Sequence, residues 1–137
     1  MADPRAFISF DFDNNSDERM LFVGQAKKNS KTPFSMEDWS SKESLPQRQW
    51  EELINSKINR CNMLIVLVGK RTATAVGVVK EIAFARSQNV PIFGVYVGGA
   101  DANTPLPEGL ARNRTISWSW DTIAAAITQM MGEGKNK

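Results

Sequence analysis

The chain has 137 residues, of which 42% are hydrophobic and 23% charged, so it is long enough to form one globular domain with a buried core. Seventeen Lys and Arg against fifteen Asp and Glu leave a net charge of +2, and the scattered basic residues do not indicate a nucleic-acid partner. Histidine is absent, which excludes Ser/His/Asp triads, Cys/His dyads and His-ligated zinc.

The cysteine count and the apolar runs bear on the compartment. Cys61 is the only cysteine, so no intramolecular disulfide can form, as is usual in a reducing compartment. The opening "MADPRAFISF" lacks the apolar run of a signal peptide, and no stretch approaches the roughly 18 apolar residues of a membrane span. We therefore expect a soluble, cytoplasmic protein with no membrane partner.

Apolar runs alternate with amphipathic stretches along the chain. Strand-like composition or helical spacing predicts, in order, a strand in 6–12, a helix in 16–28, a short strand in 32–39, a helix from about Pro46 to Cys61, a strand in 62–69, a helix over 73–88, a strand in 90–97, a short strand in 114–120 and a helix in 121–131. Ser16 is the expected N-cap of the first helix. Polar loops are expected at 40–47 and 98–109.

The strand "NMLIVLVG" is continuously apolar, as expected when both faces of a parallel sheet are covered. Strands separated by single helices indicate right-handed crossovers. We therefore predict a flavodoxin-like, three-layer α/β sandwich with a mostly parallel sheet, formed by one domain over residues 1–132 and followed by a disordered tail, 133–137. Ligands bind beyond the carboxyl ends of such strands, where "FDFDNN", "EDWSS" and "GKRTATAVG" should meet.

The stretch "GKRT" at 69–72 resembles the end of a phosphate-binding loop. That motif also requires glycine at position 64, where Leu64 lies within a strand, so the motif is rejected. Lys70 and Arg71 are still candidates for contacting phosphate groups from a strand end. The alternative is that both are ordinary solvated turn residues.

Asp11 and Asp13 follow the first strand, and such a carboxylate pair could hold a divalent cation, as in phospho-receiver domains. A receiver also needs an aspartate at the end of its third strand, where this sequence reads Val68, Gly69 and Lys70. The two aspartates are therefore interpreted either as the rim of a ligand pocket or as residues that cap the next helix or solubilise the loop.

Glu81 lies within the apolar helix "GVVKEIAFA". One helical turn to either side stand the small residues Gly77 and Ala85. Gly77 costs a helix of order 1 kcal/mol relative to alanine, so its presence suggests that room is needed there. Spacing alone leaves two readings open, a carboxylate that faces a cleft and an ordinary solvent-facing glutamate.

The sequence as a whole resembles the TIR domain, in particular the bacterial branch that includes the NAD-processing subunit of Thoeris anti-phage defence. The resemblance covers residues 5–97 and rests on "AFISFDFDN", "PFSMEDWS" and "NMLIVLVGKRTATAVGVVKEIAFARSQNVPIFGVYV". TIR domains that act on NAD carry a glutamate on this helix in a pattern resembling W-V-x-x-E plus an apolar residue. Val78, Glu81 and Ile82 match, whereas Gly77 stands where many members have tryptophan.

The resemblance implies an NAD glycohydrolase or ADP-ribosyl cyclase that cleaves the nicotinamide–ribose bond, with NAD as substrate, Glu81 as catalytic carboxylate and no metal. It further implies an NAD-binding set that comprises Ser9, Phe10, Asp11, Asp13, Trp39, Lys70 and Arg71. Phe10 and Trp39 would stack on a ring or else pack in the core. The acceptor, and so the product (ADP-ribose, a cyclic isomer or a conjugate), stays open.

Self-association through TIR–TIR contacts and a downstream effector that responds to the product are also implied by the resemblance. The main alternative is a non-catalytic TIR interaction module that uses loops 40–48 and 98–109. A nucleotide-sensing domain that binds without reacting is a third reading. Substitution of Glu81 discriminates between the enzyme and the interaction module.

Overall fold

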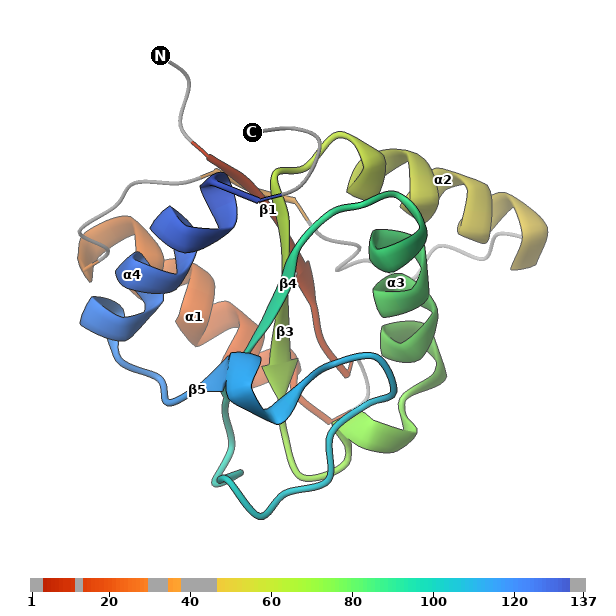
Figure 1. The fold of residues 1–137 in the computed structure, drawn as a ribbon. Coiled ribbons are helices and arrows are strands. Elements are labelled where there is room, and N and C mark those ends of the chain that lie inside the picture. The colour runs from red at the N-terminus through yellow and green to blue at the C-terminus, as the bar shows by residue number, and fades with distance from the viewer. Residues whose placement is uncertain (1–3, 12–13, 30–34, 38–46, 134–137) are drawn as a thin grey trace.

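The computed structural model describes residues 4–11, 14–29, 35–37 and 47–133. In this part of the chain, strands and helices alternate almost throughout (Figure 1). The elements are β1 (Arg5–Ser9), α1 (Ser16–Asn29), β2 (Ser35–Glu37), α2 (Gln47–Asn59), β3 (Met63–Val68), the 3-10 turn η1 (Thr72–Thr74), α3 (Val76–Ser87), β4 (Ile92–Tyr96), the 3-10 turn η2 (Arg112–Arg114), β5 (Thr115–Ile116) and α4 (Trp120–Met131).

The strands form one parallel sheet in the order β2-β1-β3-β4-β5. Its central strand, β3, is buried along its whole length and pairs Ile65 with Ile8 on one side and with Phe93 on the other. Helices α1 and α4 cover one face, and α2 and α3 cover the other (Figure 1). The predicted flavodoxin-like sandwich is confirmed, because the switch in strand order at β1 and β3 is that of a doubly wound sheet.

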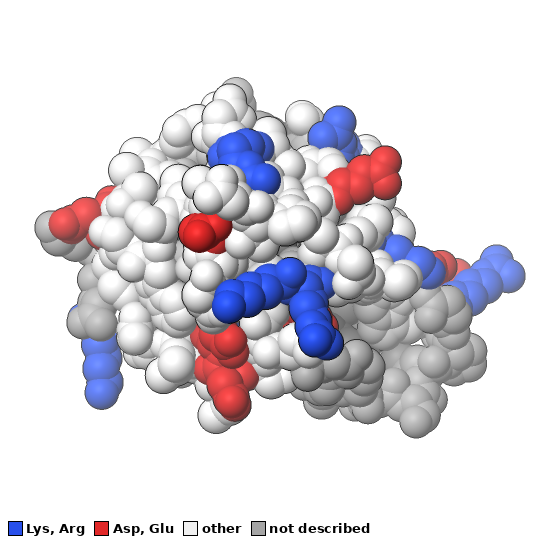
Figure 2. Space-filling view, turned by 90° about the horizontal axis from the view of Figure 1, so that it is seen from below, with Lys and Arg blue, Asp and Glu red and all other residues white. Residues whose placement is uncertain are grey.

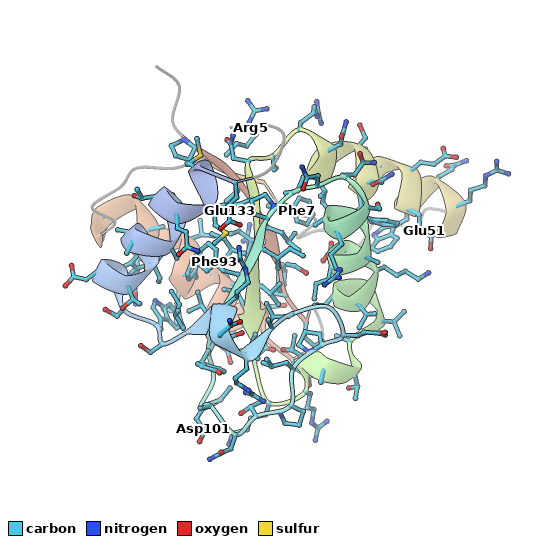
Figure 3. All side chains as sticks on the ribbon, in the orientation of Figure 1. Arg5, Phe7, Glu51, Phe93, Asp101 and Glu133 are labelled. Carbon is cyan, nitrogen blue, oxygen red and sulfur yellow. The ribbon has the colours of Figure 1, made fainter. Side chains whose placement is uncertain are left out.

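Each face of the sheet has its own apolar core because successive strand side chains point to opposite faces. Phe7 belongs to the cluster under α2 and α3, and Phe93 to the cluster under α1 and α4 (Figure 3). Burying one such aromatic side chain contributes roughly 1.5–3 kcal/mol. Both faces are therefore closed by packing, and the polar chemistry is left to the edges of the sheet.

Two helix starts differ from the sequence-based expectation. The helix expected to begin at 73 begins at Val76, because the amide of Ala75 donates to the carbonyl of Thr72 and closes the short turn η1 first. Ser16 is the first residue of α1 rather than its cap. Asn15 takes the cap position, since its carbonyl accepts the first helical hydrogen bond, from Arg19 at 3.0 Å.

Helix length bears on the expected absence of a membrane partner. Among the helices described here, none combines the length and the apolar character that a membrane span requires.

Candidate functional site

Glu81 is held at the carboxyl edge of the sheet by a residue distant in the sequence. The hydroxyl of Ser9, the last residue of β1, donates a hydrogen bond to Oε1 of Glu81 at 2.6 Å. Ser9 is fully buried and Glu81 is 7% exposed. Because Glu81 is buried, it is not the ordinary solvent-facing glutamate that the helical spacing alone allowed.

The local sequence explains why these two side chains meet. Ser9 lies two residues after Phe7 and so points to the same face of the sheet, toward α3. On α3, Glu81 shares the buried side of the helix with Val78, Ile82 and Ala85. A buried carboxyl group needs hydrogen-bond partners, and the Ser9 hydroxyl supplies one to Glu81.

Space lies beside the helix one turn before Glu81. A Cβ atom built on Gly77 would meet no atom within 4 Å in the described part of the molecule. Gly77 is therefore not required by close packing. That this position leaves room for a ligand beside Glu81 stays a prediction.

Asp11 shapes the turn between β1 and α1. Its side chain is 6% exposed, and Oδ2 accepts a hydrogen bond from the Asn14 amide at 2.6 Å. Its carbonyl accepts the backbone N–H groups of Asn14 and Asn15 at 3.2 and 2.7 Å. These bonds bring the chain out of β1 and set the start of α1 at the same edge as Ser9.

A second buried network joins this turn to the end of β3. The Gly69 amide donates to Oγ1 of Thr72 at 2.7 Å. Oγ1 in turn lies 3.3 Å from Oδ1 of Asn15 and 3.4 Å from the Leu67 carbonyl, the two acceptors available to its single proton. Thr72 is fully buried and Asn15 is 5% exposed. The expectation that the segments after the first and third strands meet is confirmed.

Neither Asn15 nor Thr72 was among the candidate residues predicted from the sequence. The available signals were an asparagine directly before a helix start and a threonine three residues after a glycine at a strand end. Gly69 itself is required by close approach, because a Cβ there would overlap the Asn15 side chain.

The two basic candidates lie on the surface of this edge. Lys70 and Arg71 are exposed in the turn that follows β3. A Cβ on Gly99 would lie 3.3 Å from Cε of Lys70, so this turn lies beside the loop that follows β4. Figure 2 shows the edge from below, with basic and acidic side chains interspersed rather than gathered into a patch of one sign.

The remaining candidates are separated from Glu81 or lie outside the described residues. Phe10 is partly buried and packs against the cluster under α1 and α4, on the face of the sheet opposite to Ser9. Asp13 and Trp39 lie outside the described residues, and so does most of "EDWSS". Within the described ranges, no group of three or more Cys, Asp or Glu side chains is arranged to hold a metal ion.

Comparison with models of known families gives a match to the segment of chain that carries Ser9 and Glu81. Residues 7–102, more than half of the chain, match the family model described as Thoeris protein ThsB, TIR-like domain. The chain belongs to this ThsB TIR-like family. The matched residues of this TIR-like domain run from β1 past β4 and include both Ser9 and Glu81. The resemblance to a Thoeris TIR-like domain is thereby confirmed.

A solved structure agrees on the fold of the TIR-like domain. It is titled "Crystal structure of conserved protein from Enterococcus faecalis V583" and aligns with a TM-score of 0.64 at 12% sequence identity. The alignment covers 93% of this chain and 99% of the other. At that identity the likeness concerns the fold alone. A search among curated protein sequences gave no match.

Proposed function

We propose that this TIR-like domain cleaves the bond between nicotinamide and ribose in NAD, with Glu81 as the catalytic carboxylate. The observation that carries the proposal is the buried hydrogen bond between Ser9 and Glu81 at the carboxyl edge of the sheet. Ligands of open α/β sheets bind at this edge, close to the switch in strand order. In this sheet, the switch lies between β1 and β3, at Ser9.

The reaction suits a chain without histidine. Nicotinamide leaves as a neutral molecule from a cationic precursor, so the bonding electrons pass to the ring nitrogen and no strong general acid is needed. The ribose passes through a transition state that resembles an oxocarbenium ion, and a fixed carboxylate stabilises that positive charge. With water as acceptor, the water oxygen bonds to the ribose carbon, a proton is released to solvent, and ADP-ribose forms.

The substrate-binding roles follow from position. Lys70 and Arg71 are exposed at this edge and are proposed to attract the diphosphate of NAD. The buried Asp11 is proposed to act through the turn that it shapes, because its carboxylate is bonded to Asn14. Phe10 packs on the other face, so its proposed contribution is to support β1. Asp13 and Trp39 stay predictions for ribose contact and ring stacking.

The test is mass spectrometry of NAD incubated with concentrated protein, beside Glu81→Gln and the matched control Glu52→Gln. Glu52 lies on α2, paired with Arg48 on the surface. We expect free nicotinamide from the unsubstituted protein and from Glu52→Gln. In Glu81→Gln, the rate of nicotinamide release should fall by about 100-fold or more, as is usual when a catalytic group is removed. The mass of the second product names the acceptor. Intact NAD at concentrations that force self-association would contradict the proposal.

A second candidate function is a TIR interaction module, since TIR-like domains often mediate protein–protein contacts. The observation that favours it is a pair of exposed apolar side chains on α1, Met20 at 65% and Leu21 at 57% exposed. We propose that they contact a second TIR-like domain. An interaction module would lose association on Met20→Ser with Leu21→Ser and be indifferent to Glu81→Gln. Analytical ultracentrifugation and the NAD cleavage assay, both applied to the Met20/Leu21 double variant and to Glu81→Gln, separate the two functions.

A further inference from the structure

A cavity of about 400 Å³ lies at the opposite edge of the sheet from Ser9, beside the amino end of β4. Its walls come from the last turn of α3, the connection 89–92, the segment 109–111, and the side chains of Arg114 and Glu133. The buried side chains of Val90, Ile92 and Leu110 supply apolar surface. This volume falls within the range of small-molecule sites.

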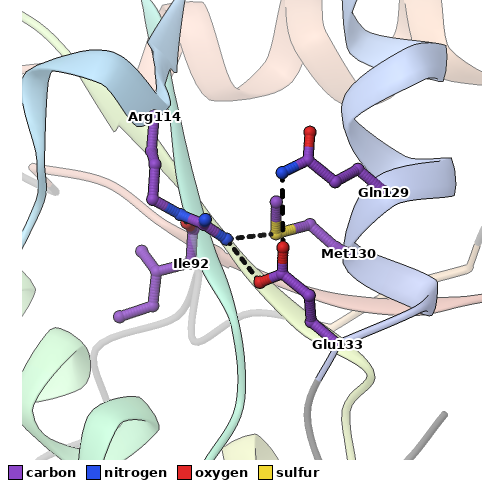
Figure 4. Close-up of polar contacts among 5 residues, drawn as sticks. All are labelled: Ile92, Arg114, Gln129, Met130 and Glu133. Atoms are coloured by element: carbon purple, nitrogen blue, oxygen red, sulfur yellow. Dashed lines mark hydrogen bonds and ion pairs between the residues drawn. The ribbon is translucent and has the colours of Figure 1, made fainter.

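Two guanidinium groups line the cavity, and each is held by a backbone carbonyl. Arg114 donates from Nε to the Ile92 carbonyl at 3.0 Å, which fixes the plane of its guanidinium (Figure 4). Arg86 donates from Nη1 to the Gly109 carbonyl at 3.1 Å. Neither contact neutralises the charge, because both acceptors are neutral.

One carboxylate already occupies part of this site. Nη2 of Arg114 donates to Oε1 of Glu133 at 2.7 Å, and Gln129 donates to Oε2 at 3.3 Å (Figure 4). The hydrogen bond from Arg114 lowers the pKa of Glu133, so that carboxyl stays ionised at neutral pH. The paired side chains are 32% and 38% exposed. A pair this exposed contributes less than about 1 kcal/mol, so a competing anion can displace it.

We propose that this cavity binds a phosphate monoester, whose phosphate group displaces Glu133 from Arg114 and also contacts Arg86. The charge balance favours this class of ligand. A monocarboxylate would give Arg114 only the single negative charge that Glu133 already provides. A phosphate monoester carries between one and a half and two negative charges, which is close to the combined charge of the two arginines, and it has three acceptor oxygens. Arginine forks match phosphate oxygens in geometry. The apolar surface beside them takes the body of the ligand.

The proposal goes beyond the NAD reaction and does not rest on it. The experiment is a titration of the ¹⁵N-labelled protein with adenosine 5′-monophosphate, followed by NMR, with neutral adenosine as the matched ligand. We expect saturable shifts of the amides of 109–111 and of the Nε–H groups of Arg86 and Arg114, and no such shifts with adenosine. Arg86→Gln should weaken binding about tenfold, the usual cost of losing one charged hydrogen bond.

Two further variants separate a specific site from general attraction. Glu133→Gln removes the competing carboxylate and should tighten binding several-fold. Arg112→Gln removes an exposed arginine that contacts the Tyr96 hydroxyl outside the cavity, and it should leave binding unchanged. Equal weakening by Arg112→Gln and Arg86→Gln would overturn the proposal, and so would the absence of saturable shifts. The Glu81→Gln variant should bind the monophosphate normally. Failure of the phosphate-binding proposal is thus distinguishable from failure of the NAD-cleavage proposal.

Discussion

Ser9 and Glu81 are 72 positions apart in the sequence, and a hydrogen bond of 2.6 Å joins their side chains in the buried interior. The bond links the carboxyl end of β1 to the second turn of α3, across the layer between sheet and helix. One carboxylate oxygen of Glu81 is thereby fixed in position relative to the strand ends. In the proposed reaction, Ser9 is a positioning residue, because it acts through Glu81 rather than on NAD.

Removal of the Ser9 hydroxyl is the first prediction. Ser9→Ala should lower kcat for NAD cleavage about tenfold to 100-fold with KM little changed, because a misplaced carboxylate affects the transition state more than substrate binding. Ser9→Cys, which keeps the shape and a weak donor, should fall between Ser and Ala. Steady-state kinetics on the three proteins checks the order. A kcat unchanged in Ser9→Ala would show that the hydrogen bond is structural only.

Thr72 carries the second prediction, which concerns stability. Thr72→Val keeps the shape but removes the oxygen that accepts the Gly69 amide, so it should cost about 1–3 kcal/mol of unfolding free energy. Thr72→Ser keeps the hydroxyl and loses only a methyl group, at about 0.8 kcal/mol. Urea denaturation at pH 7 measures both, and a serine variant as unstable as the valine variant would contradict the hydrogen-bonding role.

The open space at Gly77 leads to the third prediction. Gly77→Ala should raise the unfolding free energy by about 0.5–1 kcal/mol, because alanine is the better helix former and its Cβ meets no neighbour among the described residues. Gly24→Ala on α1 is the matched control, since in the described ranges its Cβ also meets nothing within 4 Å. If NAD uses the space beside Glu81, only Gly77→Ala lowers kcat/KM. Equal activity of the two variants would show that NAD does not occupy the space beside Gly77.

Glu133 gives a prediction with a pH dependence. The pKa of Glu133 in the folded protein lies below 4.5, because Arg114 donates a hydrogen bond to the carboxylate. The stabilising contribution of Glu133 is therefore present above pH 4.5 and is lost as the pH falls through the pKa of the folded state. Glu133→Gln should therefore cost about 0.5 kcal/mol at pH 7, a value discounted for solvent exposure, and almost nothing near pH 3. Denaturation at both pH values tests the sign. High salt should shrink the difference at pH 7.

Much of the fold was predictable because it rests on local patterns. The continuous run "MLIVLV" predicts a doubly covered strand, and β3 is buried along all of it. Apolar spacing likewise predicts α2 and α4 to within a residue or two of Gln47–Asn59 and Trp120–Met131. The start of α3 was misplaced by three residues, because the bonds that form η1 involve the turn itself and leave no trace in helical periodicity.

The candidate site was predictable in part. Side chains alternate along β1 and the residue after it, so Phe7 and Ser9 lie on one face of the sheet, and Ile8 and Phe10 on the other. This alternation was enough to predict that Phe10 lies on the face opposite to Glu81. The role of Asn15 was not visible, because its partner Thr72 is 57 residues away. The same holds for Arg114, whose pairing with Glu133 depends on where α4 returns to the sheet.

The amino-acid sequence by itself determined the class of fold, the elements and the helix that carries Glu81, since strand and helix periodicity are properties of neighbouring residues. Only the tertiary structure decided which side chains meet: Ser9 with Glu81, Asn15 with Thr72, and the two arginines around one cavity. Those pairings follow from strand order and from the way each helix returns across the sheet. Both are set by burial of apolar surface over the whole domain, which no local window of sequence contains.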